Sequence, residues 1–370
     1  MYHRILVIKL GALGDVIRTA ALLPGLKSAW PRSHITWVTR EAGVRVLTNH
    51  PLIDRLLPFD AESICHIECE QFDLCLSLDK EPGPAALAMR VHAALRRGIG
   101  LSRFGTIFPL NPECVPYFRL GLNDDLKFRQ NDKSYQQLIY EAVRLRYSGQ
   151  RYRLYVGGDH RRRAREHWAA LGVHADETVI GLNTGAGTGF ANKTWPPEKF
   201  ARLAEVLSQR HGWRIALLGG PGEVEQNRNL AKACQQLTLP MDGRDVPAVL
   251  NVCDPVLWEG RVPLELEFAA LLERCRVIVT GDTMGMHMAI AADIPCVVLF
   301  GPTCSQEIDL YGRGTKLCST MPCSPCYLRV CDKCPSCMDE LPLDDAVAAV
   351  EKWAGVPATR APIELTLAPV

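Results

Sequence analysis

The chain has 370 residues, of which 47% are hydrophobic and 22% are charged, and its formal net charge is +1. This length is enough for two domains of roughly 100–200 residues each, the composition is typical of a globular α/β protein, and the near-zero charge argues against nucleic-acid binding through a global positive field. No uninterrupted apolar run of about 18 residues occurs, and Lys9, Asp15 and Arg18 break up the first apolar stretch, so we expect a cytoplasmic protein without a signal peptide or a transmembrane helix.

The first half of the chain begins with a strand, a glycine loop and a helix. Ile5–Ile8 is a short apolar run typical of a buried strand, Gly11 and Gly14 follow it, and a helical pattern extends to Ala29. The loop lacks the full G-x-G-x-x-G spacing, so it is a poor match to a dinucleotide-binding fingerprint. Further strands are predicted at His34–Thr39, Arg55–Phe59 and Phe72–Leu78, and helices at Pro84–Leu95 and Ser134–Arg146.

The second half repeats this pattern after Gly157-Gly158, which we interpret as the hinge. Thr178–Asn183 is a predicted strand before the glycines of residues 185–189, and another predicted strand precedes the glycines of residues 219–222. We therefore predict an α/β fold with two Rossmann-like parallel-sheet domains that face a cleft, because ligands of such sheets bind at the carboxyl ends of the strands. The expected divisions are residues 1–157, residues 158–342, and a C-terminal helix and tail, residues 343–370, whose helix packs back across both domains.

The most informative corner follows the predicted strand Val277–Thr280. Gly281-Asp282-Thr283 forms a turn after it, and a helix is predicted over residues 284–292, with His287 about one turn inside. The start of a helix presents backbone N–H groups and the positive end of the helix dipole, and phosphate is a usual ligand there. The alternative for the aspartate and the histidine is a helix cap and a side chain that only packs the helix.

The loop Asn183–Trp195 is a second candidate anion site. Its glycines let the backbone approach a phosphate, and Lys193 supplies a point charge near Thr188, although a flexible loop with a solvated lysine is the alternative. Asp15 ends the first glycine loop in the other half, where it could cap a helix or accept a proton from an attacking hydroxyl. No Asp-x-Asp pair follows a predicted strand, so the sequence favours neutralisation of a diphosphate by Lys193 and helix ends over a Mg²⁺ site.

Four segments resemble glycosyltransferase family 9, the heptosyltransferase type, in order and in spacing. They are ILVIKLGALGDVIRTAALLPGLKSAWP, NTGAGTGFANKTWPPEKFARLAEVL, ALLGGPGEVEQ and GDTMGMHMAIAADIPCVVLFGPT. The resemblance implies a GT-B fold with an N-terminal acceptor domain and a C-terminal nucleotide-sugar domain. It also implies an inverting, metal-independent transfer of a heptose from a nucleotide diphosphate sugar, typically ADP-heptose, to the lipopolysaccharide core at the inner face of the inner membrane.

The resemblance further implies roles for individual residues. Asp15 matches the family's general base, and Lys9 matches its acceptor-side cation. The residues that match substrate-binding positions of the donor are Thr188, Lys193, Glu223, Asp282, Thr283, Gly285 and His287. Met284-Gly285 departs from the Gly-Pro pair that is commonest in the family, although the spacing from Asp282 to His287 is kept, so another nucleotide sugar and glycan acceptor remain the alternative.

Six cysteines lie in residues 318–337, and several of them have C-x-x-C spacing. Two-residue gaps let two thiolates reach one tetrahedral ion, so a structural zinc or iron–sulfur site is one interpretation and a set of buried free thiols is the other. We expect this loop to be structural and remote from the chemistry, and no cofactor to be required for catalysis. The expected metal ligands are Cys323, Cys326, Cys331 and Cys337.

Two other function classes share some of these features. A nicotinamide- or flavin-dependent oxidoreductase is disfavoured because Phe190 stands where the third glycine of its fingerprint would be. A non-enzymatic zinc or iron–sulfur protein organised by the cysteines is the remaining alternative. We favour a glycosyltransferase whose partners are a nucleotide-sugar donor and a lipopolysaccharide core acceptor.

Overall fold

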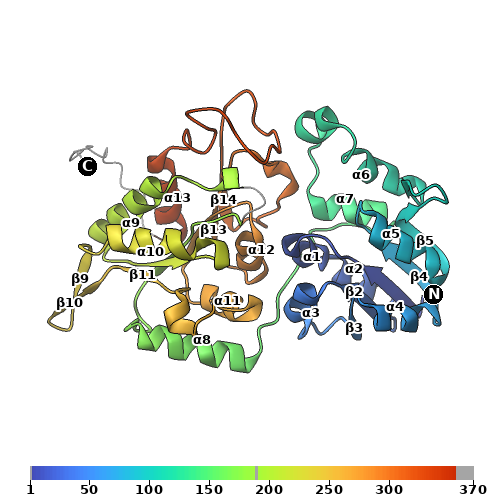
Figure 1. The fold of residues 1–370 in the computed structure, drawn as a ribbon, viewed down its shortest axis with the longest axis horizontal. Helices are drawn as coiled ribbons and strands as arrows, with labels where there is room; N and C mark the ends of the chain where they lie inside the picture. The colour runs from blue at the N-terminus through green and yellow to red at the C-terminus, as the bar shows by residue number, and fades with distance from the viewer. Residues whose placement is uncertain (1, 188–190, 356–370) are drawn as a thin grey trace.

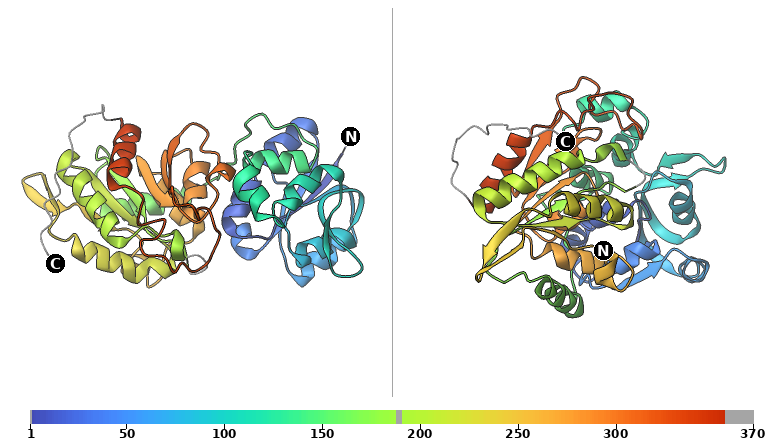
Figure 2. Two further views of the ribbon diagram at one scale, coloured as in Figure 1. Left: turned by 90° about the horizontal axis from the view of Figure 1, so that it is seen from above. Right: turned by 60° about the vertical axis from the view of Figure 1, so that its left-hand side comes forward.

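The computed structural model describes residues 2–187 and 191–355 of the chain. It has two lobes that lie side by side, and each lobe is a six-stranded sheet with helices on both faces (Figures 1 and 2). The N-terminal lobe is blue to cyan in Figure 1, and the C-terminal lobe is green to red. The predicted class of two Rossmann-like parallel-sheet halves is therefore confirmed.

The first sheet has the strands β1 (Arg4–Ile8), β2 (His34–Thr39), β3 (Arg55–Pro58), β4 (Gln71–Ser77), β5 (His92–Leu101) and β6 (Ile107–Pro109). Their order is β3-β2-β1-β4-β5-β6, and all neighbours are parallel except β5 and β6. Ile5 and Val7 of β1 belong to the apolar cluster on one face, and Leu6 and Ile8 to the cluster on the other, which explains the unbroken apolar run. The helices of this lobe are α1 (Leu13–Thr19), α2 (Leu22–Ala29), α3 (Glu41–Leu47), α4 (Ala61–Glu68), α5 (Pro82–Arg90), α6 (Val115–Arg119), the π-helical turn η2 (Leu126–Gln130) and α7 (Tyr135–Ala142).

The second sheet has the strands β7 (Val179–Asn183), β8 (Arg214–Leu218), β11 (Val249–Asn251), β12 (Val277–Gly281), β13 (Cys296–Phe300) and β14 (Gly314–Cys318). Their order is β11-β8-β7-β12-β13-β14, which repeats the strand order of the first sheet, and here all neighbours are parallel. A hairpin of β9 (Thr238–Met241) and β10 (Arg244–Pro247) stands apart from this sheet. The helices are α8 (Gly158–Ala170), α9 (Pro197–His211), α10 (Val224–Ala233), α11 (Glu265–Leu272), α12 (Met284–Ala291) and α13 (Leu343–Ala354).

Where the elements differ from the sequence prediction, the causes are local. The predicted helix Pro84–Leu95 ends at Arg90, because the backbone of Val91 is extended and residues 92–101 form β5. The predicted helix Ser134–Arg146 ends at Ala142, shortly before the left-handed backbone of Arg144. In the described part of the chain, α13 packs on α9 and on β12–β14, so the expected packing across both lobes is not observed.

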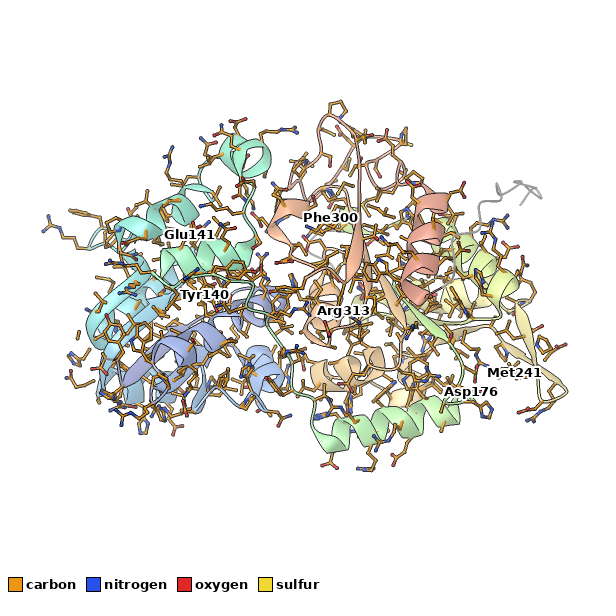
Figure 3. The ribbon with its side chains drawn as sticks, turned by 180° about the vertical axis from the view of Figure 1, so that it is seen from behind. Tyr140, Glu141, Asp176, Met241, Phe300 and Arg313 are labelled. Carbon is orange, nitrogen blue, oxygen red and sulfur yellow. The ribbon has the colours of Figure 1, made fainter. Side chains whose placement is uncertain are left out.

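The lobes touch along α1 and α12 and along α3 and α11. Arg45 of α3 donates to both carboxylate oxygens of Glu265 on α11, at 2.9 and 2.7 Å. One apolar cluster continues from the first lobe into the second. Its members include Tyr140 in the first lobe and Phe300 in the second (Figure 3). Among the described helices, none combines the length and the apolar character needed to cross a bilayer.

Candidate active site

A cavity of about 410 Å³ lies where the two lobes meet. α1 of the first lobe and α12 of the second pack against each other there (Figure 1). Both helices follow central strands, β1 and β12, at the carboxyl ends where parallel sheets bind their ligands. The lining residues are Ala12, Leu13, Gly14, Asp15, Arg18, Lys127, Ala186, Lys193, Asp282, Thr283, Met284, His287, Cys304, Glu307, Ile308 and Tyr327.

Asp15 lies in the first turn of α1 and lines this cavity. The N-cap of the helix is Ala12, so Asp15 does not have the alternative role of a helix cap. Its Oδ1 instead forms an ion pair with Arg18, three residues along the helix, at 2.7 Å. Because 34% of the Asp15 side chain is exposed, a ligand in the cavity can reach the carboxylate.

The charge state of Asp15 results from opposing effects. Burial would raise the pKa of this carboxyl, but Arg18, Lys9 and His287 outweigh burial and lower the pKa to about 2. The Arg18 guanidinium is held in turn by the ring of Tyr135, whose centre lies 3.8 Å away. Asp15 is therefore ionised at neutral pH and can accept a hydrogen bond from a hydroxyl.

The predicted corner after β12 is present, and α12 has Thr283 as its N-cap. Asp282 is therefore not the cap, and its carboxylate lies 3.6 Å from the ammonium of Lys193. Asn183, at the end of β7, donates to the Thr283 hydroxyl at 2.9 Å and packs beside Gly285. Asp282 and Thr283 line the cavity, whereas Gly285 lies behind them and lets Asn183 approach.

Lys193 reaches this corner from the middle loop. Its backbone carbonyl packs against Gly281, where a Cβ would lie only 2.8 Å from the oxygen, and its ammonium donates to the backbone carbonyl of Asp282 at 3.3 Å. Burial would raise the pKa of Asp282, but the neighbouring charges, Lys193 above all, lower it. Thr188, the other residue predicted on this loop, lies outside the described residues.

His287 of α12 lines the cavity next to Gly14 of α1. A Cβ on Gly14 would lie 2.6 Å from His287 Cδ2, so only glycine lets the two helices come this close. Burial, with a smaller effect from Arg18, lowers the pKa of His287 to about 4, and the imidazole is neutral at pH 7. Its Nδ1 lies 3.2 Å from the hydroxyl of Tyr152, whose pKa burial raises. Since that phenol keeps its proton and can donate to Nδ1, the Nε2–H group is left to bind a ligand.

Besides Gly285, two predicted site residues that the structure describes do not line the cavity. Lys9 is 3% exposed and forms a buried ion pair with Asp79 beyond the end of β4. Glu223 accepts hydrogen bonds from the backbone N–H groups of Gly220, at 2.8 Å, and Gly187, at 3.1 Å. The charge of Lys9 therefore lowers the pKa of Asp15 although Lys9 does not line the cavity. Glu223 connects the two glycine loops through its hydrogen bonds.

The cysteine-rich loop, residues 318–337, reaches the cavity through Tyr327. This ring stacks on Phe128 of η2 with centres 5.3 Å apart, and the ammonium of Lys127 lies 3.7 Å from its centre. Arg129 donates to the carbonyl of Pro322 at 3.0 Å. The expectation that this loop is remote from the candidate site is therefore wrong, because η2 of the first lobe holds the loop against the cavity.

The expected metal ligands in this loop are Cys323, Cys326, Cys331 and Cys337. Burial, together with the charges of the other three thiols, raises the pKa of Cys337 to about 11, so the four side chains lie near one another. Cys318 and Cys334, which the expected set leaves out, are exposed. Within residues 2–187 and 191–355, however, no three His, Cys, Asp or Glu side chains are arranged to hold a metal ion, and the metal site remains a prediction.

Several lining residues are absent from the set that the sequence predicts. Arg18 follows Asp15 by three residues on one helix, and that spacing is a sequence signal for the ion pair. Lys127, Glu307 and Tyr327 come from distant segments and meet only in the folded chain, where Lys127 Nζ lies 3.9 Å from a Glu307 oxygen. No local pattern marks these three residues.

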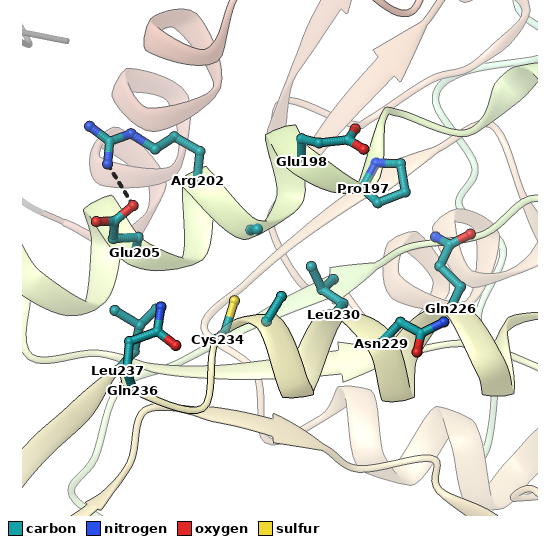
Figure 4. A pocket seen from close by; sticks show the side chains of 12 residues that line it. Pro197, Glu198, Arg202, Glu205, Gln226, Asn229, Leu230, Cys234, Gln236 and Leu237 are labelled. Carbon is teal, nitrogen blue, oxygen red and sulfur yellow. Dashed lines mark hydrogen bonds and ion pairs between the residues drawn. The ribbon is translucent and has the colours of Figure 1, made fainter. Parts of the chain in front are cut away.

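A larger hollow of about 630 Å³ lies between α9 and α10 (Figure 4). Its polar groups do not converge on a ligand, because Arg202 and Glu205 pair with each other at 2.5 Å and Gln226 donates to the backbone carbonyl of Thr184. Of the predicted site residues that the structure describes, none lines this hollow. We therefore place the candidate active site between the lobes.

Known proteins are similar to this chain in sequence and in fold. The family model of glycosyltransferase family 9 (heptosyltransferase) matches residues 128–335. Lipopolysaccharide heptosyltransferase 1 of Pseudomonas aeruginosa is 25% identical over 351 residues, which cover 90% of this chain and 88% of the relative.

Two solved structures show the same GT-B fold. A glycosyltransferase family 9 protein of Veillonella parvula has a TM-score of 0.72 at 22% identity, over 95% of this chain and 97% of that one. Heptosyltransferase WaaC of E. coli with ADP-2-deoxy-2-fluoro heptose has a TM-score of 0.56 at 18% identity, over 85% of this chain and 93% of that one. Since the family model matches more than half of the chain, the protein belongs to glycosyltransferase family 9, the heptosyltransferases.

Proposed function

We propose that this glycosyltransferase moves a heptose, or a related sugar, from ADP-heptose to a hydroxyl of the lipopolysaccharide core at the inner face of the inner membrane, with inversion and without a metal ion. One observation carries the proposal: Asp15 of the first lobe and Lys193 with the start of α12 in the second line the same cavity. The name of the Pseudomonas relative and the ADP-heptose analogue in the WaaC structure support this choice of acceptor and donor.

The second lobe supplies the donor-binding groups. The N-terminus of α12 favours a phosphate through its backbone N–H groups and its dipole. The carboxylate of Asp282 is 3.6 Å from Lys193, which is longer than a hydrogen bond, so a diphosphate can compete for the ammonium. Asp282 is then an acceptor for sugar hydroxyls, and the Nε2–H of His287 is a donor.

The first lobe supplies the base. The acceptor oxygen attacks the anomeric carbon from the face opposite the diphosphate, and the hydroxyl proton passes to Asp15. The bond from the anomeric carbon to the diphosphate oxygen breaks, and the nucleoside diphosphate leaves with the electron pair. Lys193 and the start of α12 stabilise the charge that develops on this leaving group, so the scheme requires no metal ion.

Lys193→Ala is expected to weaken ADP binding by about 1–3 kcal/mol, because a charge-assisted contact to the diphosphate is lost. Calorimetric titrations with ADP and AMP measure the effect, and we expect the parent to prefer ADP. Lys232→Ala, on the exposed side of α10, is the matched control. An unchanged ADP affinity in Lys193→Ala would remove this lysine from the site.

The complete proposal is tested with a panel of nucleotide sugars. We expect ADP-heptose to stabilise the protein against heating more than UDP- or GDP-sugars, and transfer to a lipopolysaccharide core acceptor to persist in EDTA. The anomeric configuration of the product, read by NMR, should be opposite to that of the donor. Stabilisation by another nucleotide sugar alone would point to the alternative donor, and a retained configuration would contradict the mechanism.

We also propose a structural zinc ion or iron–sulfur cluster on the four expected cysteine ligands, since thiolates at this spacing suit a tetrahedral ion. Elemental analysis and the absorption spectrum of the purified protein should show stoichiometric metal. Cys323→Ser combined with Cys326→Ser should lower the melting temperature and the metal content. The matched control is Cys65→Ser with Cys69→Ser, two exposed thiols of which the first lies on α4 and the second is the C-cap of that helix. A metal-free parent whose stability is the same in the double variant would contradict the site.

A further inference from the structure

The N-cap residue of α12 does not cap its own helix. A threonine at this position ordinarily accepts a hydrogen bond from the backbone N–H of the second or third helical residue. Thr283 has the extended backbone of an N-cap, but its side chain accepts no such bond. In the described part of the chain, the N–H groups of residues 284–286 donate to no other acceptor either. Gly285 and Met286 are buried, and a buried N–H group without a partner is costly, so the start of α12 is left open to an outside acceptor.

Asn183 holds the hydroxyl of Thr283 away from the helix. It ends β7 directly beside Thr280 of β12, and it is only 6% exposed. Its side-chain amide donates to the hydroxyl oxygens of Thr280 and Thr283, at 2.9 Å each. The oxygen of Thr283 is therefore occupied by Asn183 instead of by the N–H groups of α12.

Gly285 gives the amide of Asn183 the room that this bond requires. A Cβ on Gly285 would lie 2.9 Å from the Asn183 amide nitrogen and 3.1 Å from its Cγ. The backbone of Gly285 does not have a positive φ, so its conformation does not call for glycine. Since glycine lowers helix stability relative to alanine, the close approach of Asn183 is the local reason for a glycine at this place.

We propose that Asn183 is a positioning residue of the donor site, which keeps the start of α12 uncapped so that its N–H groups bind a phosphate of the donor. The inference rests on the proposed function, which places the donor diphosphate at this corner. Without the bond from Asn183, the hydroxyl of Thr283 can turn to the N–H groups of residues 285 and 286 and compete with the phosphate. Asn183 does not line the cavity, so it acts through Thr283, which does.

Gly285→Ala tests the inference, because the added methyl group displaces the amide of Asn183 without removing a side chain that lines the cavity. We expect ADP to bind at least about fivefold more weakly in calorimetric titrations, since the phosphate must displace the new cap. The melting temperature without ligand should not fall, because alanine replaces a helical glycine and Thr283 now caps the helix. Gly83→Ala is the matched control, since Gly83 is also the second residue of a helix and has nothing within 4 Å of an added Cβ.

A second set of variants shows whether the effect passes through Thr283. In the Thr283→Ala background no hydroxyl can cap the helix, so Gly285→Ala should change the ADP affinity by less than about twofold. A loss of the same size in both backgrounds would overturn the inference, and so would a folded Gly285→Ala that binds ADP like the parent. If Gly285→Ala does not fold, Asn183→Ala is judged by the same results. Failure of both variants to fold would assign Asn183 a structural role and overturn the inference.

Hydrogen exchange over α12 separates this inference from the proposed function, because it needs no ligand. In nucleotide-free Gly285→Ala, the N–H groups of residues 285 and 286 should exchange more slowly than in the parent, since they gain the Thr283 oxygen as acceptor. Adding Thr283→Ala should abolish this difference. A parent that does not bind ADP would count against the proposed function alone, whereas unchanged exchange in Gly285→Ala would overturn the role of Asn183.

Discussion

Asp15→Asn is expected to turn over at least about a hundredfold more slowly than the parent while it binds ADP nearly as well. Asparagine keeps the shape of the side chain and an oxygen that can face Arg18, but it cannot take a proton from the acceptor hydroxyl. The N-cap of α1 is Ala12, so the substitution removes no helix cap and we expect normal folding. Single-turnover transfer at saturating donor, with calorimetry for ADP, measures the two quantities separately.

The matched control for this experiment is Asp159→Asn. Asp159 lies on α8 with 92% of its side chain exposed, and its contact with Arg162 is 3.6 Å long. This variant should keep the parental rate. A rate close to parental in Asp15→Asn would place the base elsewhere and leave Asp15 as the partner of Arg18.

Arg18→Met is expected to move the acidic limb of the pH–rate profile upward by up to about two pH units. Transfer requires the ionised form of Asp15, whose pKa of about 2 in the parent keeps kcat/KM flat down to the lowest pH at which the protein stays folded. Arg18 is the largest of the charges that lower this pKa, and without it burial is opposed only by the smaller effects of Lys9 and His287, so the pKa of Asp15 rises towards its ordinary value. The rate of the variant should therefore fall as the pH decreases below about 5.

The measurement is kcat/KM between pH 4 and 8, because this quantity reports groups of the free enzyme. Arg162→Met is the control, since Arg162 pairs with Glu166 on the exposed surface of α8. Circular dichroism at each pH shows that the protein stays folded. A profile as flat as the parent's in Arg18→Met would contradict control of Asp15 by this arginine.

Local sequence patterns were sufficient to predict the two strand-to-helix turns that form the site. The strand of residues 5–8 and the strand Val277–Gly281 are buried on both faces, so unbroken apolar runs mark them, and glycine and polar residues mark the turns that follow. Asp15 and Asp282 lie in those turns or directly after them, which is why the sequence predicts both as site residues. The membership in glycosyltransferase family 9, shown by the family model over residues 128–335, makes the non-enzymatic alternative wrong.

Contacts between distant segments decided the rest, because side-chain neighbours across two lobes leave no periodic signal in the chain. Lys9 stands in the first motif, yet the pairing of β1 with β4 buries it against Asp79 rather than in the cavity. Tyr327 lies in a loop that its cysteines mark as structural, yet stacking on Phe128 brings its ring to the cavity. The sequence by itself thus determined the fold and the two ends of the site, and the closure of the lobes determined which charges meet between them.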